Sequence, residues 1–158
     1  MKGIELAEYF HQDLFSNSLS AKTKDEAIKE MLDMFVQNGY IRNADPVLQM
    51  LRQRESLGST GLGNGIAIPH GRTTAAPDVL IAFGKSEAGI EFDSMDGKPV
   101  HLVFMIIAPP HEVGNLYLPI LGGLVTVLKE SKSRKKLLKC NGFEEFITVI
   151  KGESVNDK

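Results

Sequence analysis

One histidine, His70, ends a glycine-rich stretch that reads GSTGLGNGIAIPHG at residues 58–71. The ring of Pro69 before it and the small Gly71 after it restrict the backbone and leave space in front of the imidazole. An unperturbed imidazole has a pKa of about 6.5, so it is largely neutral at physiological pH and can attack a phosphoryl group. The stretch therefore indicates either covalent phosphoryl chemistry on His70 or, in the simpler interpretation, a turn that ends a strand.

The residues before this histidine supply groups suited to a phosphoryl anion. Ser59 and Thr60 offer hydroxyls, and the glycines from Gly61 onward leave backbone N–H groups uncovered, which favours an anion-binding concavity. Arg54 precedes the loop, and a guanidinium either binds phosphate oxygens in a bidentate manner or caps the carbonyls of a helix end. Arg72, after the histidine, either adds a charge at the rim of this site or forms a surface ion pair.

Other site chemistries fit the sequence poorly. The stretch lacks the GxxxxGK[ST] pattern of a P-loop, and GLG at residues 61–63 lacks the third glycine of a dinucleotide fingerprint. No GxSxG elbow and no HExxH motif occurs. Metal-ligand spacing is also absent among the histidines, which are His11, His70, His101 and His111. We therefore expect no metal site.

The composition predicts one globular domain. The chain has 158 residues, of which 42% are hydrophobic, and its net charge is -2, so it can bury a core and carries no basic excess that would favour nucleic acid. The single cysteine, Cys140, excludes a disulfide framework. The sequence has no apolar run of about 18 residues and no signal-peptide pattern, so we expect a cytoplasmic protein without membrane insertion.

Capping signals and apolar spacing predict the helices. A capping-box pattern at residues 23–26 begins a helix that ends near Asn38, and Asp45 is expected to cap a helix that starts at Pro46. The helix at residues 116–129 must start near residues 115–117, because proline at position 119 is tolerated only in the first turn. The other helices are predicted at residues 4–10, with Ile4 facing inward, and at residues 46–56, 131–139 and 143–152.

Three apolar segments predict strands, at residues 66–68, 79–85 and 100–108. The last of them, VHLVFMIIA, is long and nearly all apolar, as expected of a central strand. Because helices and strands alternate, the sequence predicts a single α/β domain with a mixed β-sheet at residues 1–152. Residues 153–158 are expected to form a frayed tail.

The sequence also resembles a known family. RESLGSTGLGNGIAIPHG at residues 54–71 closely resembles the active-site segment of mannitol/fructose-type (type-2) enzyme IIA domains of the phosphotransferase system, PTS, and is most similar to the nitrogen-regulatory branch. FDSMDGKPV at residues 92–100 resembles the family's F-D-x-x-D-x-x-P-V segment, and the apolar run that follows resembles the next strand. The likeness covers nearly the whole chain. It implies a mixed β-sheet flanked by helices on both faces, and no metal or organic cofactor.

The resemblance implies roles for individual residues. His70 becomes the phosphoryl acceptor, through Nε2, and Arg54 matches the arginine that stabilises the phosphoryl group. Ser59, Thr60 and Gly61 fall in the matching phosphate-binding loop. The implied donor is a histidine-containing phosphocarrier protein charged from phosphoenolpyruvate, and the implied function is a phosphohistidine carrier whose phosphorylation state controls regulatory protein targets.

One position departs from the family pattern. A second histidine usually opens an H-L-x-x-L segment after the long strand, whereas this chain reads YLPIL and has Tyr117 there. A phenol donates one hydrogen bond but is not a cation near neutral pH, so phosphorylated His70 loses a positive partner. His111, six residues earlier, is either a substitute for that histidine or a solvated loop residue.

Two other functions remain open. A sugar-specific, fructose/mannitol-type enzyme IIA would pass phosphate to the B domain of a permease. The residues of the motif and the lack of an attached B or C domain favour the regulatory branch over the sugar-specific one. A degenerate binding module would never be phosphorylated, and the replacement at Tyr117 is its only support.

Overall fold

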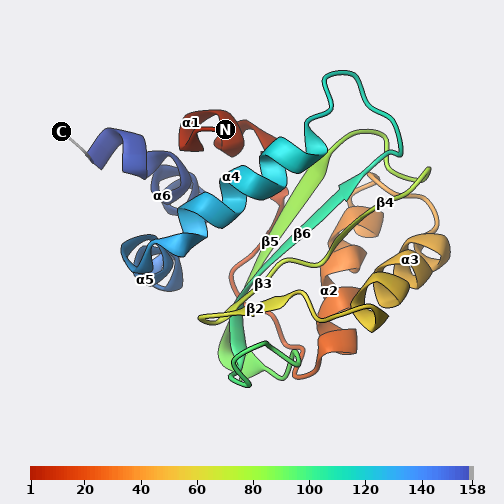
Figure 1. The fold of residues 1–158 in the computed structure, drawn as a ribbon, viewed down its shortest axis with the longest axis horizontal. Coiled ribbons are helices and arrows are strands. Elements are labelled where there is room, and N and C mark those ends of the chain that lie inside the picture. The colour runs from red at the N-terminus through yellow and green to blue at the C-terminus, as the bar shows by residue number, and fades with distance from the viewer. Residues whose placement is uncertain (157–158) are drawn as a thin grey trace.

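The structure, a computed structural model, describes residues 1–156, and its side chains through Gly152. Its strands form one mixed sheet in the order β1-β5-β6-β3-β2, with β4 also paired to β6 (Figure 1). The strands are β1 (Phe10–Ser16), β2 (Gly61–Gly63), β3 (Ile66–Ala67), β4 (His70–Arg72), β5 (Leu80–Ile90) and β6 (Val100–Ala108).

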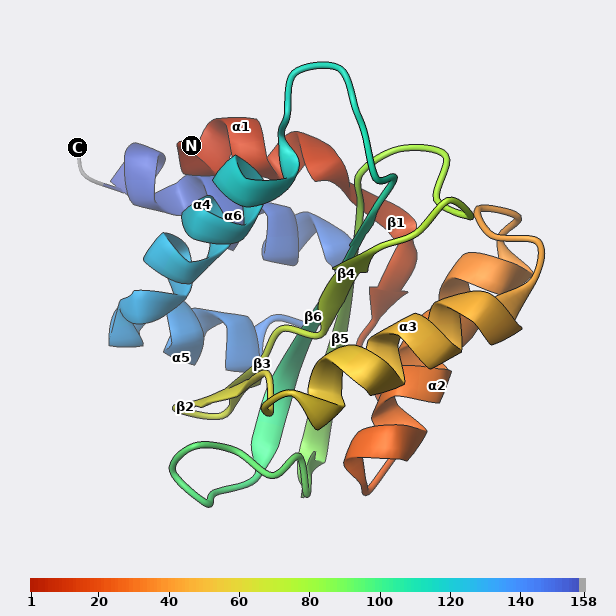
Figure 2. The same ribbon diagram turned by 45° about the vertical axis from the view of Figure 1, so that its right-hand side comes forward.

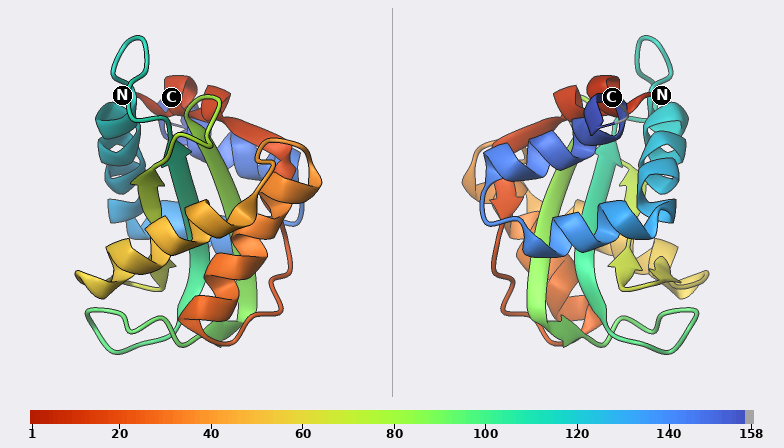
Figure 3. Two further views of the ribbon diagram at one scale, coloured as in Figure 1. Left: turned by 90° about the vertical axis from the view of Figure 1, so that its right-hand side faces the viewer. Right: turned by 90° about the vertical axis from the view of Figure 1, so that its left-hand side faces the viewer.

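Helices cover both faces of this sheet, as Figure 2 and the two views of Figure 3 show. On one face lie α2 (Lys24–Gln37) and α3 (Ala44–Ser56). On the other lie α1 (Gly3–Leu6), α4 (Tyr117–Lys129), α5 (Ser131–Lys139) and α6 (Phe143–Asn156). The predicted α/β domain, with its mixed sheet between two layers of helices, is therefore confirmed.

The central strand β6 divides the core in two. It runs antiparallel to β5 and parallel to both β3 and β4. Successive side chains of a strand point to opposite faces, so Phe104 and Ile106 join the core beneath α4, α5 and α6, while Met105 and Ile107 join the core beneath α2 and α3. Burial on both faces explains the apolar run that predicted this strand.

The helix predicted at residues 4–10 is confirmed as far as Tyr9, but its end at Phe10 and the inward position of Ile4 are wrong. Helix α1 ends at Leu6, a 3₁₀ turn η1 (Ala7–Tyr9) follows, and β1 begins at Phe10. Ile4 is 49% exposed instead of facing inward. Strand β1 pairs with β5 in parallel, and its register shifts between Phe10 and Phe15, so its buried residues do not alternate in the regular way that identifies a strand from sequence.

The cap predicted for α3 is also wrong. Asn43 is the N-cap, and its side chain accepts a hydrogen bond from the backbone N–H of Asp45 at 3.3 Å. Pro46 therefore lies at the third helical position, still within the first turn, where its missing N–H leaves no hydrogen bond unmade. By contrast, Thr23 caps α2 as predicted, and α4 starts at Tyr117 with its proline in the first turn.

Two segments are longer than predicted. Strand β5 extends to Ile90, five residues past the expected end. Helix α6 includes residues 153–156, which we expected in the tail, and residues 157–158 lie outside the described part of the chain.

Candidate active site

The glycine-rich stretch is folded largely as a hairpin. Strands β2 and β3 pair in antiparallel fashion and are joined at Asn64 and Gly65, which have φ angles of 57° and 79°. Positive φ at both positions is typical of a type I′ turn, for which Asn-Gly is the preferred sequence. The sequence analysis missed this hairpin, although Asn64-Gly65 is its usual signal.

The hairpin leads His70 to the edge of the sheet beside β6. Ile66 pairs with Leu102 and His70 pairs with Ile106, so both β3 and β4 run along the same strand. Between them, the carbonyl of Pro69 accepts a hydrogen bond from the N–H of Ile106 at 3.0 Å. His70 is the first residue of β4, and its side chain is half-buried.

The imidazole of His70 is held in one tautomer. Its Nδ1 lies 2.7 Å from the carbonyl oxygen of Ile68. A carbonyl only accepts, so Nδ1 carries the proton and donates it, and the neutral ring keeps its lone pair on Nε2. Nε2 makes no hydrogen bond to any residue that the structure describes. This geometry prepares Nε2 to act as a nucleophile.

Gly71 allows α3 to approach the site. A Cβ on Gly71 would lie 2.0 Å from Sδ of Met50, so a side chain there would displace the end of the Met50 side chain in α3. The glycine thus serves helix packing, where the sequence had suggested space in front of the imidazole. The close approach brings the last turn of α3, with Arg54, toward β4.

Arg54 has a structural contact and an electrostatic one. Its Nη1 donates a hydrogen bond to the carbonyl of Gly58 at 2.9 Å, so it secures the loop after α3. Its charge also reaches Tyr117: burial raises the pKa of the Tyr117 phenol, and the charges of Arg72 and Arg54 partly oppose that rise. Capping the loop and acting on the site are therefore compatible roles for Arg54.

Ser59 and Thr60 use their hydroxyls within the loop. Oγ of Ser59 donates to the carbonyl of Phe92 at 2.9 Å and accepts from the N–H of Gly61 at 3.0 Å. Thr60 is 2% exposed and donates from both its N–H and its hydroxyl to the carboxylate of Glu55. These bonds shape the loop, and direct contact of Ser59, Thr60 or Gly61 with a phosphoryl group stays a prediction.

Glu55 is a residue that the sequence analysis missed. Glu55 is 8% exposed, and its carboxylate accepts from Thr60 and lies 3.3 Å from Nζ of Lys24 in α2. This network ties the loop to two helices. A carboxylate in the last turn of a helix opposes the helix dipole, and that mismatch is the signal that could have identified Glu55.

Tyr117 lies beside His70 at the start of α4. The two ring centroids are 6.3 Å apart, and Tyr117 is 7% exposed. His111, by contrast, is exposed in the loop before α4, and it makes no hydrogen bond or ring contact with the described residues. The structure therefore brings Tyr117, and not His111, to the imidazole.

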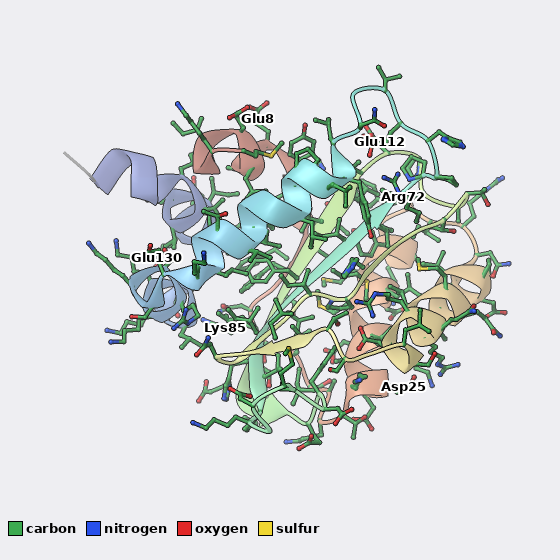
Figure 4. All side chains as sticks on the ribbon, viewed as in Figure 1. Glu8, Asp25, Arg72, Lys85, Glu112 and Glu130 are labelled. Carbon is green, nitrogen blue, oxygen red and sulfur yellow. The ribbon has the colours of Figure 1, made fainter. Side chains whose placement is uncertain are left out.

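Arg72 and Glu112 connect β4 to the start of α4, and Figure 4 labels both. The carboxylate of Glu112 accepts from the N–H groups of Leu116 and Tyr117 at 2.7 and 2.9 Å. Nη1 of Arg72 lies 3.9 Å from that carboxylate, and Cζ of Arg72 lies 4.5 Å from the ring centroid of Tyr117. Tyr117 is thus bordered by His70 and by a fixed guanidinium.

The described residues offer neither a metal-binding cluster nor a membrane span. They contain no group of three or more His, Cys, Asp or Glu side chains placed to hold a metal ion. Within the same residues, every helix is too short or too polar to cross a membrane.

Comparisons with known proteins show which family this chain resembles. A family model described as "Phosphoenolpyruvate-dependent sugar phosphotransferase system, EIIA 2" matches residues 8–153. A fructose-specific EIIA component from Haloferax volcanii is 40% identical over 138 residues, which cover 87% of this chain and 89% of that protein. A nitrogen regulatory protein from Bradyrhizobium diazoefficiens is 35% identical over 134 residues, covering 84% of this chain and 86% of that protein.

A third relative is much longer than this chain. The fructose-specific EIIABC component of Bacillus subtilis is 34% identical over 147 residues, which are 93% of this chain and 23% of that protein. The chain thus spans about a quarter of that relative's length.

Two solved structures share the fold. The nitrogen regulatory protein IIA-Ntr from Neisseria meningitidis superposes with a TM-score of 0.83 at 28% identity, over 92% of this chain and 99% of that one. The mannitol IIA structure from Escherichia coli gives a TM-score of 0.74 at 24% identity, over 89% and 98% of the two chains.

Proposed function

The chain belongs to the EIIA 2 family of the phosphoenolpyruvate-dependent sugar phosphotransferase system, and we propose that it carries a phosphoryl group on Nε2 of His70. The family resemblance of residues 54–71 is thereby confirmed. The proposal is carried by the family match over residues 8–153, and the 2.7 Å contact between Nδ1 of His70 and the carbonyl of Ile68, which leaves the lone pair on Nε2, is consistent with it. The proposed donor is a histidine-containing phosphocarrier protein.

The proposed transfer needs only the imidazole and its donor. The lone pair on Nε2 of His70 attacks the phosphorus of the donor's phosphohistidine, and a new N–P bond forms. The donor's N–P bond breaks, and its electron pair returns to the donor imidazole. The proton on Nδ1 stays in its hydrogen bond to Ile68, and nearby cations such as Arg54 stabilise the charge on the transferring group.

We further propose that the phosphorylation state is a regulatory signal for protein targets. A phosphoryl group adds about -1.5 to -2 charges at pH 7, which is comparable to the net charge of -2 of the whole chain. The wording of the motif and the likeness to IIA-Ntr support this branch. The proposed exchange takes place in the cytoplasm.

A sugar-specific role is the second candidate. It is favoured by the fructose-specific relative that is 40% identical to this chain over most of both lengths. In that case the phosphoryl group on His70 would pass to the B domain of a permease. Incubation of the phosphorylated protein with a purified fructose-type B domain distinguishes the two roles. Transfer to the B domain supports the sugar-specific role, and retention on His70 supports the regulatory one.

The proposal is tested by intact mass after incubation with phosphoenolpyruvate and the upstream carriers. We expect one added phosphate on the wild type and none on His70→Ala, with both proteins folded by circular dichroism. A wild type that gains no phosphate while the carriers are active would contradict the proposal. It would support a binding module that is never phosphorylated.

A further inference from the structure

We propose that Arg72 supplies the second positive charge of the His70 site, which Tyr117 cannot provide. The inference rests on the proposed phosphorylation of His70 and adds to it a residue that binds the phosphoryl group. Tyr117 stands where the family usually has a histidine, and Arg72 borders its ring.

His70 and Arg72 share one face of strand β4. They are two residues apart in β4, and residues at this spacing project from the same face of a strand. The Tyr117 ring contacts both, with its centroid 6.3 Å from that of His70 and 4.5 Å from Cζ of Arg72. A guanidinium this close to an aromatic ring makes a cation–π contact, so the ring of Tyr117 supports Arg72 beside His70.

The backbone of the loop after β6 holds one side of the guanidinium. Nη1 of Arg72 donates to the carbonyls of Pro109 and Pro110 at 3.0 and 3.2 Å. Among the described residues, every hydrogen bond of the Arg72 side chain uses this one nitrogen, so Nε and Nη2 remain available. A guanidinium fixed on one side and open on the other is preorganised to bind a phosphoryl oxygen.

The acidic neighbour Glu112 leaves the positive charge of Arg72 available to a phosphoryl group. The carboxylate of Glu112 lies 3.9 Å from Nη1 and accepts hydrogen bonds from the N–H groups of Leu116 and Tyr117. The Tyr117 phenol stays neutral near pH 7, because burial raises its pKa further above an already high ordinary value. The guanidinium is always charged. Arg72 is thus the fixed cation on the Tyr117 side of the site.

The test compares Arg72→Gln with Arg72→Lys and with the matched control Arg42→Gln, which removes one charge from an exposed arginine elsewhere. Two quantities are measured on each protein. The first is the rate of phosphoryl transfer from the phosphocarrier protein, and the second is the pKa of the phosphoryl group on His70, followed by ³¹P NMR. The pKa of the phosphoryl group is recorded on the isolated phosphorylated protein, without the phosphocarrier. It therefore separates an effect on the phosphoryl group from an effect on docking.

We expect Arg72→Gln to slow transfer by about 10-fold, which is less than the loss of a fully enclosed donor because the Arg72 side chain is 36% exposed. It should also raise the pKa of the phosphoryl group, because a nearby cation favours the dianion. Arg72→Lys should keep much of both effects, and Arg42→Gln should match the wild type. Tyr117→His in the Arg72→Gln background should restore part of the rate, because a protonated imidazole replaces the lost charge.

An unchanged transfer rate in Arg72→Gln would overturn the inference, as would slower transfer with an unchanged phosphoryl pKa. The proposed function would survive either result, provided that the wild type is phosphorylated and His70→Ala is not. Failure of the wild type to accept phosphate would instead remove the proposed function and this inference with it. Should Arg72→Gln not fold, Arg72→Met provides a second neutral variant with the same expected results.

Discussion

Two histidines lie toward opposite ends of the central strand β6, and both hold the same tautomer. His70 pairs with Ile106 near the end of β6, whereas His101 is the second residue of that strand. Both are half-buried. Nδ1 of His70 lies 2.7 Å from the carbonyl of Ile68, and Nδ1 of His101 lies 2.8 Å from that of Ser86. Tautomer alone therefore does not distinguish an acceptor from a structural histidine.

The two histidines differ in their surroundings. His101 lines a cavity of 540 Å³ together with Lys85, labelled in Figure 4, whose ammonium donates to the carbonyls of Leu138 and Cys140 at the end of α5. A Cβ on Gly89 would lie 3.6 Å from Nε2 of His101, so the backbone there packs against the ring. Its neighbouring cation is bound to carbonyls, and its Nε2 is partly covered.

The cation beside His70 is less fully engaged. Nε2 makes no hydrogen bond to a described residue in either histidine, but Cζ of Arg72 lies 4.5 Å from the centroid of the adjacent Tyr117 ring, and Arg72 uses only Nη1 for its hydrogen bonds to described residues. The difference indicates that an available cation beside the ring, added to the tautomer, identifies the candidate acceptor.

The largest expected effect separates the two histidines directly. His70→Ala should abolish phosphorylation, whereas His101→Ala should accept phosphate at the wild-type level, because His70 is the proposed acceptor and the ring of His101 packs against the backbone at Gly89. Intact mass after incubation with the carriers measures both. The comparison between the two histidines is contradicted if His101→Ala accepts no phosphate while circular dichroism shows an intact fold.

Arg54→Ala should slow transfer by about 100-fold, since one charged group near the transferring phosphoryl is lost. The matched control is Arg52→Ala in the same helix, whose guanidinium pairs with Asp25 at 2.8 Å on the surface. The control should transfer phosphate normally and lose at most about 1 kcal/mol of unfolding free energy. Rapid-quench kinetics and urea denaturation measure the two quantities, and equal rates in the two variants would contradict a role for Arg54 at the site.

Tyr117→His should speed transfer a few-fold, because it restores a side chain that can become a cation beside His70. The sign with pH follows from an imidazole pKa of about 6.5: the gain should be present below that pH and fade as the pH rises above it. Transfer rates measured across this range check the prediction. A gain that is independent of pH would show that charge is not what the tyrosine lacks.

The smallest effect concerns the position of α3. Gly71→Ala should destabilise the fold by at most about 1 kcal/mol, because its Cβ would displace only the flexible end of the Met50 side chain in α3. Gly122→Ala is the matched control, since its Cβ meets nothing within 4 Å in the interior of α4, and it should be stabilising by about 0.5–1 kcal/mol. Urea denaturation measures both, and equal stabilities would contradict the close packing of α3 on β4.

The features predicted correctly depend on local signals. Strand β6 was identified by its continuous apolar run, α2 by the cap at Thr23, and the start of α4 by the restriction that Pro119 imposes. Features that depend on distant pairing were missed. Strand β1 is defined by its ladder with β5, about 70 positions later, so no local pattern indicates it.

Within the site, too, the features with local signals could be predicted and those that depend on distant contacts could not. His70 and the glycine-rich stretch stand out in the sequence because proline and glycine flank them. The buried pair of Lys24 and Glu55 joins two helices, and the contact between Arg72 and Tyr117 joins β4 to α4. Such contacts arise only when the chain folds, so residue types and spacing could not predict them.

The most direct test of the account is the ¹⁵N NMR spectrum of the His70 ring, recorded before and after phosphorylation. We predict a neutral ring with its proton on Nδ1 in the free protein, because Nδ1 donates to the carbonyl of Ile68, and phosphorus bonded to Nε2 afterwards. A free ring with its proton on Nε2, or phosphorus bonded to Nδ1, would contradict the claim that this hydrogen bond selects the reactive nitrogen.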